Sequence, residues 1–309
     1  MDAQDFHEGE QRIRARAQLD AYTLAASRYY RPYMPEQHRE LFERLPFIVV
    51  GALDAQGQPW ATLLEGPPGF IRATDEYHLR LHARVPDVDP LSASLRAGSP
   101  IGLLGIEPRT RRRNRANGVI EEATPSFIDV HVLQSFGNCP KYIQARTVEY
   151  VAGRRLVPQV RRIAADDDAF KAIISQADTF FIASAHPRAV YGTQPQYGVD
   201  VSHRGGRAGF VQLHDGVLSV DDYSGNNFFN TLGNLELLPR AGLLFIDMAA
   251  GALLHLAVRA DIEWLAGSRP GRNGTNRVLR FHVDDAWYVE QRSALEWGAA
   301  ELSPFLQRD

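Results

Sequence analysis

The stretch PIGLLGIE (100–107) reappears 140 residues later as RAGLLFID (240–247). Two further matches follow the same order, namely GFI (69–71) with GFV (209–211) at the same spacing, and PFIVVGAL (46–53) with TFFIASAH (179–186) at a spacing of 133. Repeats of solenoid proteins are roughly 20–50 residues long. The longer period therefore indicates duplication of a whole domain, with about seven extra residues in the second copy.

Each copy has the pattern of β-structure. The runs FIVVGALD, WATLLEG, GFIRA and YHLRLHA are short and apolar or alternating, and turn signals such as AQGQP and EGPPG separate them. Several short strands at this spacing predict an antiparallel barrel or sandwich. We therefore expect a mainly β protein of the α+β class.

Helices are expected at four places outside the Asn-rich turn described below, at 7–30, 34–45, 144–153 and 166–178. The last two would bridge the copies, which places the domain boundary near 150–165. The expected organisation is an N-terminal helical segment, a first barrel and a second barrel that carries the main site, at 1–40, 41–155 and 156–309 respectively.

Composition and charge narrow the class of protein. Apolar residues make up 44% of the 309 residues and the formal net charge is −3, so no global cationic field favours nucleic acid or a membrane. The single cysteine, Cys139, excludes an intrachain disulfide and favours a reducing compartment. We find no signal-peptide pattern and no run of about 18 apolar residues. A cytoplasmic location is expected.

The segment DDYSGNNFFNTLGN (221–234) follows an alternating run and precedes a short helical pattern that Pro239 stops. A strand, a polar turn and a helix N-terminus together can hold an anion, because unpaired backbone N–H groups point outward there. The Asn residues also suit a turn and a helix cap, with no ligand. Since Asn is neutral, a phosphate here would need a cation from elsewhere.

Two arginine-rich segments are candidate sources of that cation. SHRGGRAGF (202–210) combines His203, Arg204 and Arg207 with glycines that allow close approach of a ligand. EPRTRRRNRANG (107–118) is interpreted as a cationic turn of the first barrel. Such a run forms either a solvated face or a phosphate grip. RNA binding is disfavoured, because no aromatic recognition pattern accompanies the run.

SFGNCPKYIQAR (135–146) sets a tight turn before Cys139 and Pro140, and then Lys141 on an expected helix opening. A cysteine there is either reactive or a buried structural thiol. The sequence contains no HExxH, CxxC, P-loop, GxGxxG or GxSxG motif, and its ten histidines lack zinc-ligand spacing. No metal site is expected.

Residues 204–247 resemble the core of the flavin-binding split barrels, the superfamily of pyridoxamine 5′-phosphate oxidase. In that superfamily a strand carrying Arg, a strand ending at the flavin, a short helix and an xPRxxLLF strand follow in this order. Together with 135–146, the chain resembles the FMN-binding subgroup related to that oxidase. The likeness covers most of 40–265 and implies two tandem FMN-binding split barrels with short peripheral helices.

The resemblance also implies a site. FMN would lie against a strand at 207–211, and Asn230 and Thr231 fall where the oxidases hold the phosphate with an Arg-Lys pair. Arg111–Arg113 or Lys141 would restore the lost charge. The implied cofactor-binding residues are Arg207, Ala208, Gly209, Phe210, Val211, Asp222, Tyr223, Ser224, Asn227, Asn230, Thr231, Arg111, Arg112, Arg113 and Lys141. His203 or Arg204 would be the catalytic proton donor.

These features predict an FMN-dependent oxidoreductase that transfers a hydride or electrons to a small-molecule substrate or a redox partner protein. The tail at 290–309 lacks the Arg and His grip of the true oxidases, so pyridoxamine phosphate is not the expected substrate. In the superfamily the flavin lies between two barrels, which one chain or a homodimer can supply, and we expect a homodimer. The alternatives are a flavin- or other ligand-binding module that acts with a separate reductase, and a scaffold whose arginines meet an acidic partner.

Overall fold

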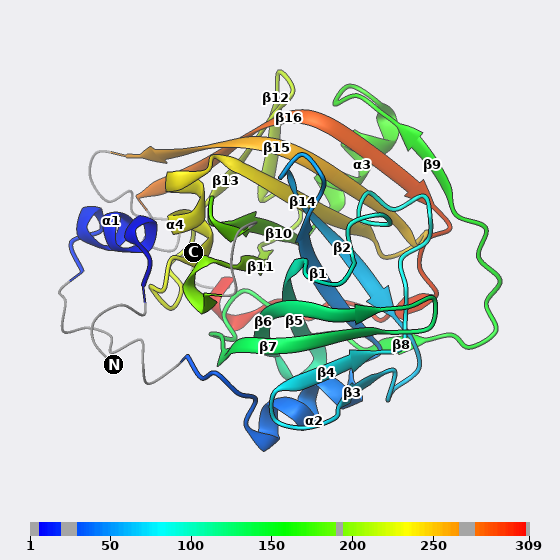
Figure 1. Cartoon of the computed structure of the whole chain (residues 1–309). Helices are drawn as coiled ribbons and strands as arrows, with labels where there is room; N and C mark the ends of the chain where they lie inside the picture. Colours follow the sequence, from blue (N-terminus) through cyan, green and yellow to red (C-terminus); the bar gives the residue numbers. More distant parts are fainter. Residues whose placement is uncertain (1–5, 20–29, 190–193, 266–275, 307–309) are drawn as a thin grey trace.

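The structure is a computed structural model, and it describes residues 6–19, 30–189, 194–265 and 276–306. The chain is mostly β, with four α-helices and several antiparallel sheets in the described part (Figure 1). The helices are α1 (Glu8–Arg16), α2 (Glu36–Arg44), α3 (Asp168–Gln176) and α4 (Asn230–Leu237). Short 3-10 helices cover Pro108–Thr110, Pro195–Tyr197 and Pro304–Leu306.

Two large antiparallel sheets contain nearly all the strands. The first sheet consists of β1 (Phe47–Leu53), β2 (Pro59–Glu65), β3 (Ile71–Ala73), β4 (His78–Leu81), β5 (Pro100–Glu107), β6 (Arg112–Ala123) and β7 (Ile128–Gly137). The second consists of β9 (Gln159–Arg162), β10 (Thr179–Ala185), β11 (Val199–Gly205), β12 (Val211–His214), β13 (Val217–Asp221), β14 (Arg240–Asp247), β15 (Ala252–Trp264) and β16 (Arg277–Glu290). A small third sheet pairs β8 (Val148–Tyr150) with β17 (Leu295–Trp297).

The two large sheets have the same topology. The first has the strand order β2-β1-β5-β6-β7-β4-β3, and the second has β11-β10-β14-β15-β16-β13-β12, with β9 added beside β16. Each strand of the first sheet therefore has a counterpart in the second, in the same chain order. The sequence repeat corresponds to a repeated sheet.

The sheet register corrects the spacing at the start of the repeat. Val49 of β1 pairs with Leu104, and Phe181 of β10 pairs with Leu244. Since Leu104 and Leu244 are 140 residues apart, Val49 is equivalent to Phe181, 132 residues later rather than 133. The short apolar runs had left the alignment uncertain by one residue, and the hydrogen-bonded partners determine it.

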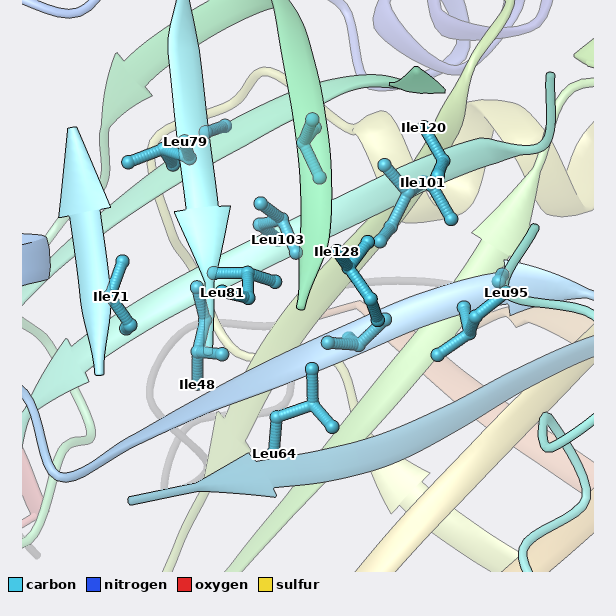
Figure 2. Packing of buried hydrophobic residues seen from close by; sticks show 14 of the residues in the cluster. Ile48, Leu64, Ile71, Leu79, Leu81, Leu95, Ile101, Leu103, Ile120 and Ile128 are labelled. Atoms are coloured by element: carbon cyan, nitrogen blue, oxygen red, sulfur yellow. The ribbon is translucent and has the colours of Figure 1, made fainter. Parts of the chain in front are cut away.

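The first strand of each copy is buried on both faces, which explains its continuous apolar sequence. In β1, Ile48 and Val50 point into the core of the first sheet, whereas Phe47 and Val49 belong to a separate cluster between the two sheets. Phe180 and Phe181 of β10 divide in the same way. Figure 2 shows the first core, with Ile48, Leu64, Leu81, Leu103, Ile128 and their neighbours converging from several strands.

Glycines of the repeated motif allow the two sheets to approach closely. A Cβ at Gly102 of β5 would lie 2.5 Å from the carbonyl oxygen of Val199 in β11. Its counterpart Gly242 of β14 faces β2, where a Cβ would lie 2.4 Å from the Cα of Trp60. Any larger residue would push the sheets apart, so the shared GLL of the motif reflects contact between the two copies.

Three of the expected helices are found where the sequence placed them. α2 and α3 lie within 34–45 and 166–178, and α4 follows the Asn-rich turn and ends at Leu237, before Pro239. The N-terminal helix is shorter than the expected 7–30, since α1 ends at Arg16, and 20–29 lie outside the described residues. None of the described helices is long and apolar enough to cross a membrane.

Two helix predictions were wrong. Residues 144–153 contain β8 rather than a bridging helix, because the alternation of Val148, Glu149 and Tyr150 pairs with β17 near the C-terminus. The segment after Cys139 is not helical either, and Tyr142 has a left-handed backbone with φ of 65°. Lys141 therefore does not lie at a helix N-terminus.

Candidate functional site

A polar cleft lies where the first sheet meets the second, covered by the irregular segment 222–229. It has two adjoining parts, one beside α4 with a cavity volume of about 70 Å³ and one beside Tyr142 with a volume of about 40 Å³. Both parts share the lining residues Arg113, His203, Arg204, Tyr223 and Gly225. The part beside α4 adds Arg115, Asn138, Ser202, Asp222, Asn226, Asn227, Phe229, Asn230, Thr231, Leu232 and Arg277, and the part beside Tyr142 adds Cys139, Lys141, Tyr142, Gly205, Phe210, Val220 and Asp221.

The arginine-rich run at 107–118 contributes side chains to this cleft. It can do so because most of the run forms strand β6 rather than the expected turn. Successive side chains of a strand point to opposite faces. Arg113 and Arg115 therefore share the face toward the second sheet, while Arg112 points away and donates to the carbonyl oxygen of Gln37 at 3.1 Å. Arg111, in the turn before β6, is held by Ile143 and Glu301.

Arg115 is buried in a network that joins the two sheets. Its Nη1 lies 3.3 Å from Oδ1 of Asp200 and 3.2 Å from Oδ1 of Asn230, and its Nη2 donates to the hydroxyl of Ser202. That hydroxyl also bonds the hydroxyl of Thr231, 2.8 Å away. The first turn of α4 is thus tied to a guanidinium of the first sheet.

Arg113 has a different environment. Its Nε donates to the carbonyl oxygen of Cys139 at 2.9 Å and its Nη1 to that of His203 at 3.3 Å, and it forms no ion pair with any described residue. Burial, with smaller effects of the nearby Arg115 and Arg204, lowers the pKa of Arg113 to about 9. Arg113 is still cationic near pH 7, and its charge is not balanced by a carboxylate of its own.

A second pair of guanidinium groups surrounds one carboxylate. Asp222 is 4% exposed, and its two oxygens lie 3.3 Å from Nη2 of Arg204 and 2.9 Å from Nε of Arg277. Together with Arg113 and Arg115, four guanidinium groups line the cleft, and Asp200 and Asp222 are the carboxylates that pair with them among the described residues. The cleft is therefore positively charged.

Several donors of the cleft lack acceptors. Among the described residues, Nε of Arg115, Nε of Arg204 and Nδ2 of Asn138 are buried and form no hydrogen bond. A buried donor left unsatisfied costs about 1–3 kcal/mol. All three are N–H donors, and two of them belong to cations, so the group that would satisfy them is an anion rich in acceptor oxygens.

His203 lies among these cations and is 4% exposed. Burial lowers its pKa well below the ordinary value, and the charges of Arg113, Arg204 and Arg146 act in the same direction. The imidazole is therefore neutral near pH 7. Beside it, the hydroxyl of Tyr142 donates to the carbonyl oxygen of Ser224 at 3.0 Å, and burial raises the pKa of Tyr142 to about 12.

The structure brings together ten of the residues expected at the site. These are His203, Arg204, Phe210, Asp222, Tyr223, Asn227, Asn230, Thr231, Arg113 and Lys141. Ser224 contacts the cleft through its carbonyl oxygen, by way of Tyr142.

Six expected residues lie away from the cleft lining. Arg207, Ala208 and Gly209 form a turn rather than the expected strand, and Arg207 donates to the carbonyl oxygen of Leu306. Val211 begins β12 and lines a separate groove beside α3. Arg111 and Arg112 have the other partners described above. The glycines at 205, 206 and 209 give this segment a tight turn, so the next strand begins four residues later than expected.

The sequence reasoning missed four polar residues of the lining. They are Arg115, Asn138, Ser202 and Arg277. Arg115 could have been found, because a strand over 112–123 places it on the same face as Arg113. No pattern in the sequence identifies Arg277, which opens β16.

The equivalent position in the other copy is mostly apolar. Arg115 pairs with Leu104 and His255 with Leu244, so these two residues are equivalent, and Arg113 is equivalent to Leu253. On the facing strands, His203 corresponds to Leu63 and Asp200 to Trp60 by the same register argument. His255 is buried beside the ion pair of Asp89 and Arg292. Arg113 and Arg115 therefore have no arginine equivalents in the other copy.

No protein-family model matches the sequence, and a search of curated proteins found no match. Among solved structures, HupZ of Group A Streptococcus has a TM-score of 0.30 and 12% identity, covering 40% of this chain and 98% of its own. A "putative pyridoxamine 5′-phosphate oxidase" of Lactobacillus delbrueckii has a TM-score of 0.28 and 15% identity, covering 34% and 95%. An FAD-binding protein of Mesorhizobium loti has a TM-score of 0.29 and 11% identity, covering 42% and 97%. These TM-scores are too low to establish a shared fold, so the function is inferred from the cleft.

Proposed function

We propose that the cleft binds the phosphate of a phosphorylated cofactor, and that the cofactor is FMN. The observation that supports this most directly is the set of buried N–H donors on Arg115, Arg204 and Asn138 that have no acceptor, beside the unpaired charge of Arg113. A phosphate offers several acceptor oxygens and a double negative charge, which suits such donors. FMN is chosen over other phosphorylated ligands because of the sequence resemblance to the flavin-binding split barrels. Under this proposal the two sheets are tandem split barrels.

The hydrogen-bond donors of the cleft suit a phosphate, but the cavity is too small for the whole cofactor. Cofactor sites have volumes of about 300–1,000 Å³, and both parts of this cleft are smaller. The segment 222–229 contains Asn227 and Phe229 with φ of 61° and 62°, a left-handed backbone that Asn adopts readily but that is strained for a bulky residue such as Phe. We propose that this segment moves to admit the flavin ring, while the donors on β6 and β11 stay in place.

The protein's residues would then bind and orient the cofactor. Arg113, Arg115 and Arg204 neutralise the phosphate, and Thr231 and Asn226 contribute neutral donors. The aromatic rings of Tyr142 and Tyr223, whose centroids are 5.0 Å apart, line the part of the cleft with the smaller cavity, where an apolar ring system would contact them. Bound FMN supplies hydride or electron transfer. A neutral His203 would act through a hydrogen bond rather than as an imidazolium acid.

A second candidate is a flavin-binding module without turnover of its own. The small cavity favours it, because little space remains for a substrate beside a bound cofactor. Reduction of the bound flavin by NADH or NADPH, followed by turnover with an acceptor, would support the oxidoreductase. Flavin that remains oxidised with both donors would support the binding module.

The test is a visible absorption spectrum of the purified protein mixed with FMN and passed through gel filtration. We expect perturbed flavin bands that elute with the protein, and competition by millimolar inorganic phosphate. Riboflavin, which lacks the phosphate, should be retained much less. Equal retention of riboflavin and FMN would contradict the assignment of the cleft to phosphate.

A further inference from the structure

A group of three side chains lies outside the cleft, where the start of α1 meets the end of β10. His7, Glu8 and His186 each offer one metal-ligand atom, and these atoms lie within 4.8 Å of one another. His7 is 5% exposed and His186 is 2% exposed. The two histidines are 179 positions apart in the chain, so their spacing in the sequence could not indicate a metal site.

Both imidazole rings are oriented by backbone N–H groups. Nδ1 of His7 accepts a hydrogen bond from the N–H of Gly9 at 3.2 Å, which caps α1, and Nδ1 of His186 accepts from the N–H of Arg188 at 3.0 Å. A ring nitrogen that accepts a hydrogen bond carries no proton, so each neutral ring has its proton on Nε2. The ring of Tyr197 also stacks on His186, with centroids 4.4 Å apart. In both rings Nε2 is the atom available to a ligand.

These Nε2 atoms are incompletely satisfied by the protein. Nε2 of His186 lies 3.3 Å from Oε1 of Glu8. Nε2 of His7 is buried and lies 3.7 Å from Oε2 of Glu10, which is too far for a hydrogen bond, and Asn234 is its other polar neighbour. The rings meet edge to face, with centroids 5.0 Å apart. An unpaired N–H on a buried imidazole is costly, and replacing its proton by a metal ion removes that cost.

We propose that His7, Glu8 and His186 form a binding site for a divalent transition-metal ion of the zinc class. Two imidazoles and a carboxylate are ligands that zinc uses, with bonds of about 2.0–2.2 Å. A tetrahedral ion with such bonds needs ligand atoms about 3.4 Å apart. Glu8 and His186 already have this spacing, since Oε1 and Nε2 lie 3.3 Å apart, and the ligand atom of His7 lies within 4.8 Å of both. The fourth position is left for water.

An ion there would anchor the N-terminal helix. Glu10 of α1 accepts from Nδ2 of Asn230 at 2.6 Å, and Arg14 donates to the carbonyl oxygen of Asn227 at 3.1 Å. Figure 1 shows α1 beside α4, the helix that follows the segment 222–229. The proposed ion would therefore connect the start of α1 to the end of β10. The site itself does not depend on the identity of the ligand in the cleft.

The test uses the full chain, stripped with EDTA and free of added flavin. We expect one Co²⁺ per chain, with the intense visible bands of a tetrahedral ion, and displacement of Co²⁺ by Zn²⁺. Zn²⁺ should also raise the midpoint of thermal unfolding. Calorimetric titration with Zn²⁺ gives the stoichiometry independently of any bound chromophore.

The variants His7→Asn and His186→Asn test the ligands with little change in structure. Asn is a good helix N-cap and can accept the same backbone hydrogen bonds, but it removes Nε2. Each substitution should weaken metal binding by about tenfold or more. The unfolding midpoint in EDTA shows whether each variant is folded.

The control is His131→Asn, in the exposed group His78, Glu121 and His131, where a metal could also bind. This substitution should leave the stoichiometric site intact. The proposal is overturned if the folded protein takes up no stoichiometric ion. It is equally overturned if binding survives both His7→Asn and His186→Asn, or if it is lost only in the control.

Discussion

Nη1 of Arg113 donates a hydrogen bond to the backbone carbonyl of His203 across 3.3 Å, which joins β6 of the first sheet to β11 of the second. The cleft therefore exists only where the two copies of the repeat meet. It is asymmetric, because the equivalent of Arg113 in the other copy is Leu253. Duplication supplied two equivalent positions, and one of them has arginines at the places of Arg113 and Arg115.

The first prediction concerns binding at Arg113. Arg113→Met should weaken FMN binding by about tenfold or more, because the variant loses a buried cation that has no carboxylate partner in the described part of the chain. Arg112→Met is the matched control, since Arg112 precedes it on the same strand but points away from the cleft. Fluorescence titration of FMN measures both affinities. Equal affinities of the two variants would contradict the assignment of Arg113.

The second prediction separates Arg113 from Arg115 by stability. Arg115→Met leaves Asp200 buried without its guanidinium partner, and breaking a buried pair costs about 3–5 kcal/mol. Arg113→Met leaves no described carboxylate without its partner, so it should lower the free energy of unfolding much less. Urea unfolding at pH 7 measures both free energies. If the two variants unfold at the same urea concentration, the Arg115–Asp200 pair is not structural.

The third prediction concerns the contact between the sheets. Gly102→Ala and Gly242→Ala each place a Cβ within 2.5 Å of backbone atoms of the facing strand, and should destabilise by about 1–3 kcal/mol. Gly198→Ala is the control, because the nearest atom to its added Cβ is 3.7 Å away. Its free energy of unfolding should change by about 0.5 kcal/mol or less. Thermal or urea unfolding distinguishes these cases.

The fourth prediction is a pH dependence that arises at His38. Its Nδ1 lies 2.8 Å from Oγ of Ser135, and burial, with the charges of Arg31 and Arg112, lowers its pKa to about 4. The unfolded chain, with a pKa of about 6.5, then binds more protons than the folded chain between pH 6.5 and 4. Stability should therefore fall with the pH across this window, by up to about 3 kcal/mol from this group.

The variant His38→Gln should flatten that part of the pH dependence. His82→Gln, at an exposed position, serves as the control and should leave the slope unchanged. The measurement is the urea midpoint at pH 7, 6, 5 and 4.5. A slope that is the same in wild type and His38→Gln would assign the effect to other groups.

Much of the fold can be predicted from local patterns in the sequence. The repeated GLL motif indicates duplication, and the continuous apolar run at 47–53 indicates a strand with two buried faces. The apolar periods and N-terminal residues of α2 and α3, together with Pro239 after α4, locate three helices. Each of these features depends on neighbours within a few residues, which is the range over which propensity and periodicity act.

Local sequence patterns fail to predict the backbone conformation where contacts with distant segments determine it. The Pro and Lys after Cys139 resemble a helix start, yet the backbone there is irregular and Tyr142 bonds Ser224, 82 residues away. Residues 148–150 form a strand because they meet β17 from the far end of the chain. Arg111–Arg113 were interpreted together as a phosphate grip, although only Arg113 faces the cleft.

The sequence by itself determined that the chain is β-rich and duplicated, that its basic residues are clustered, and that an Asn-rich turn precedes a short helix. Tertiary structure decided which basic residues meet. Arg113 and Arg115 come from one sheet, Arg204 and Arg277 from the other, and His7 reaches His186 only when α1 packs beside α4. The reason is physical: a site built from distant segments depends on sheet register and on packing between sheets, and neither leaves a periodic trace in the sequence.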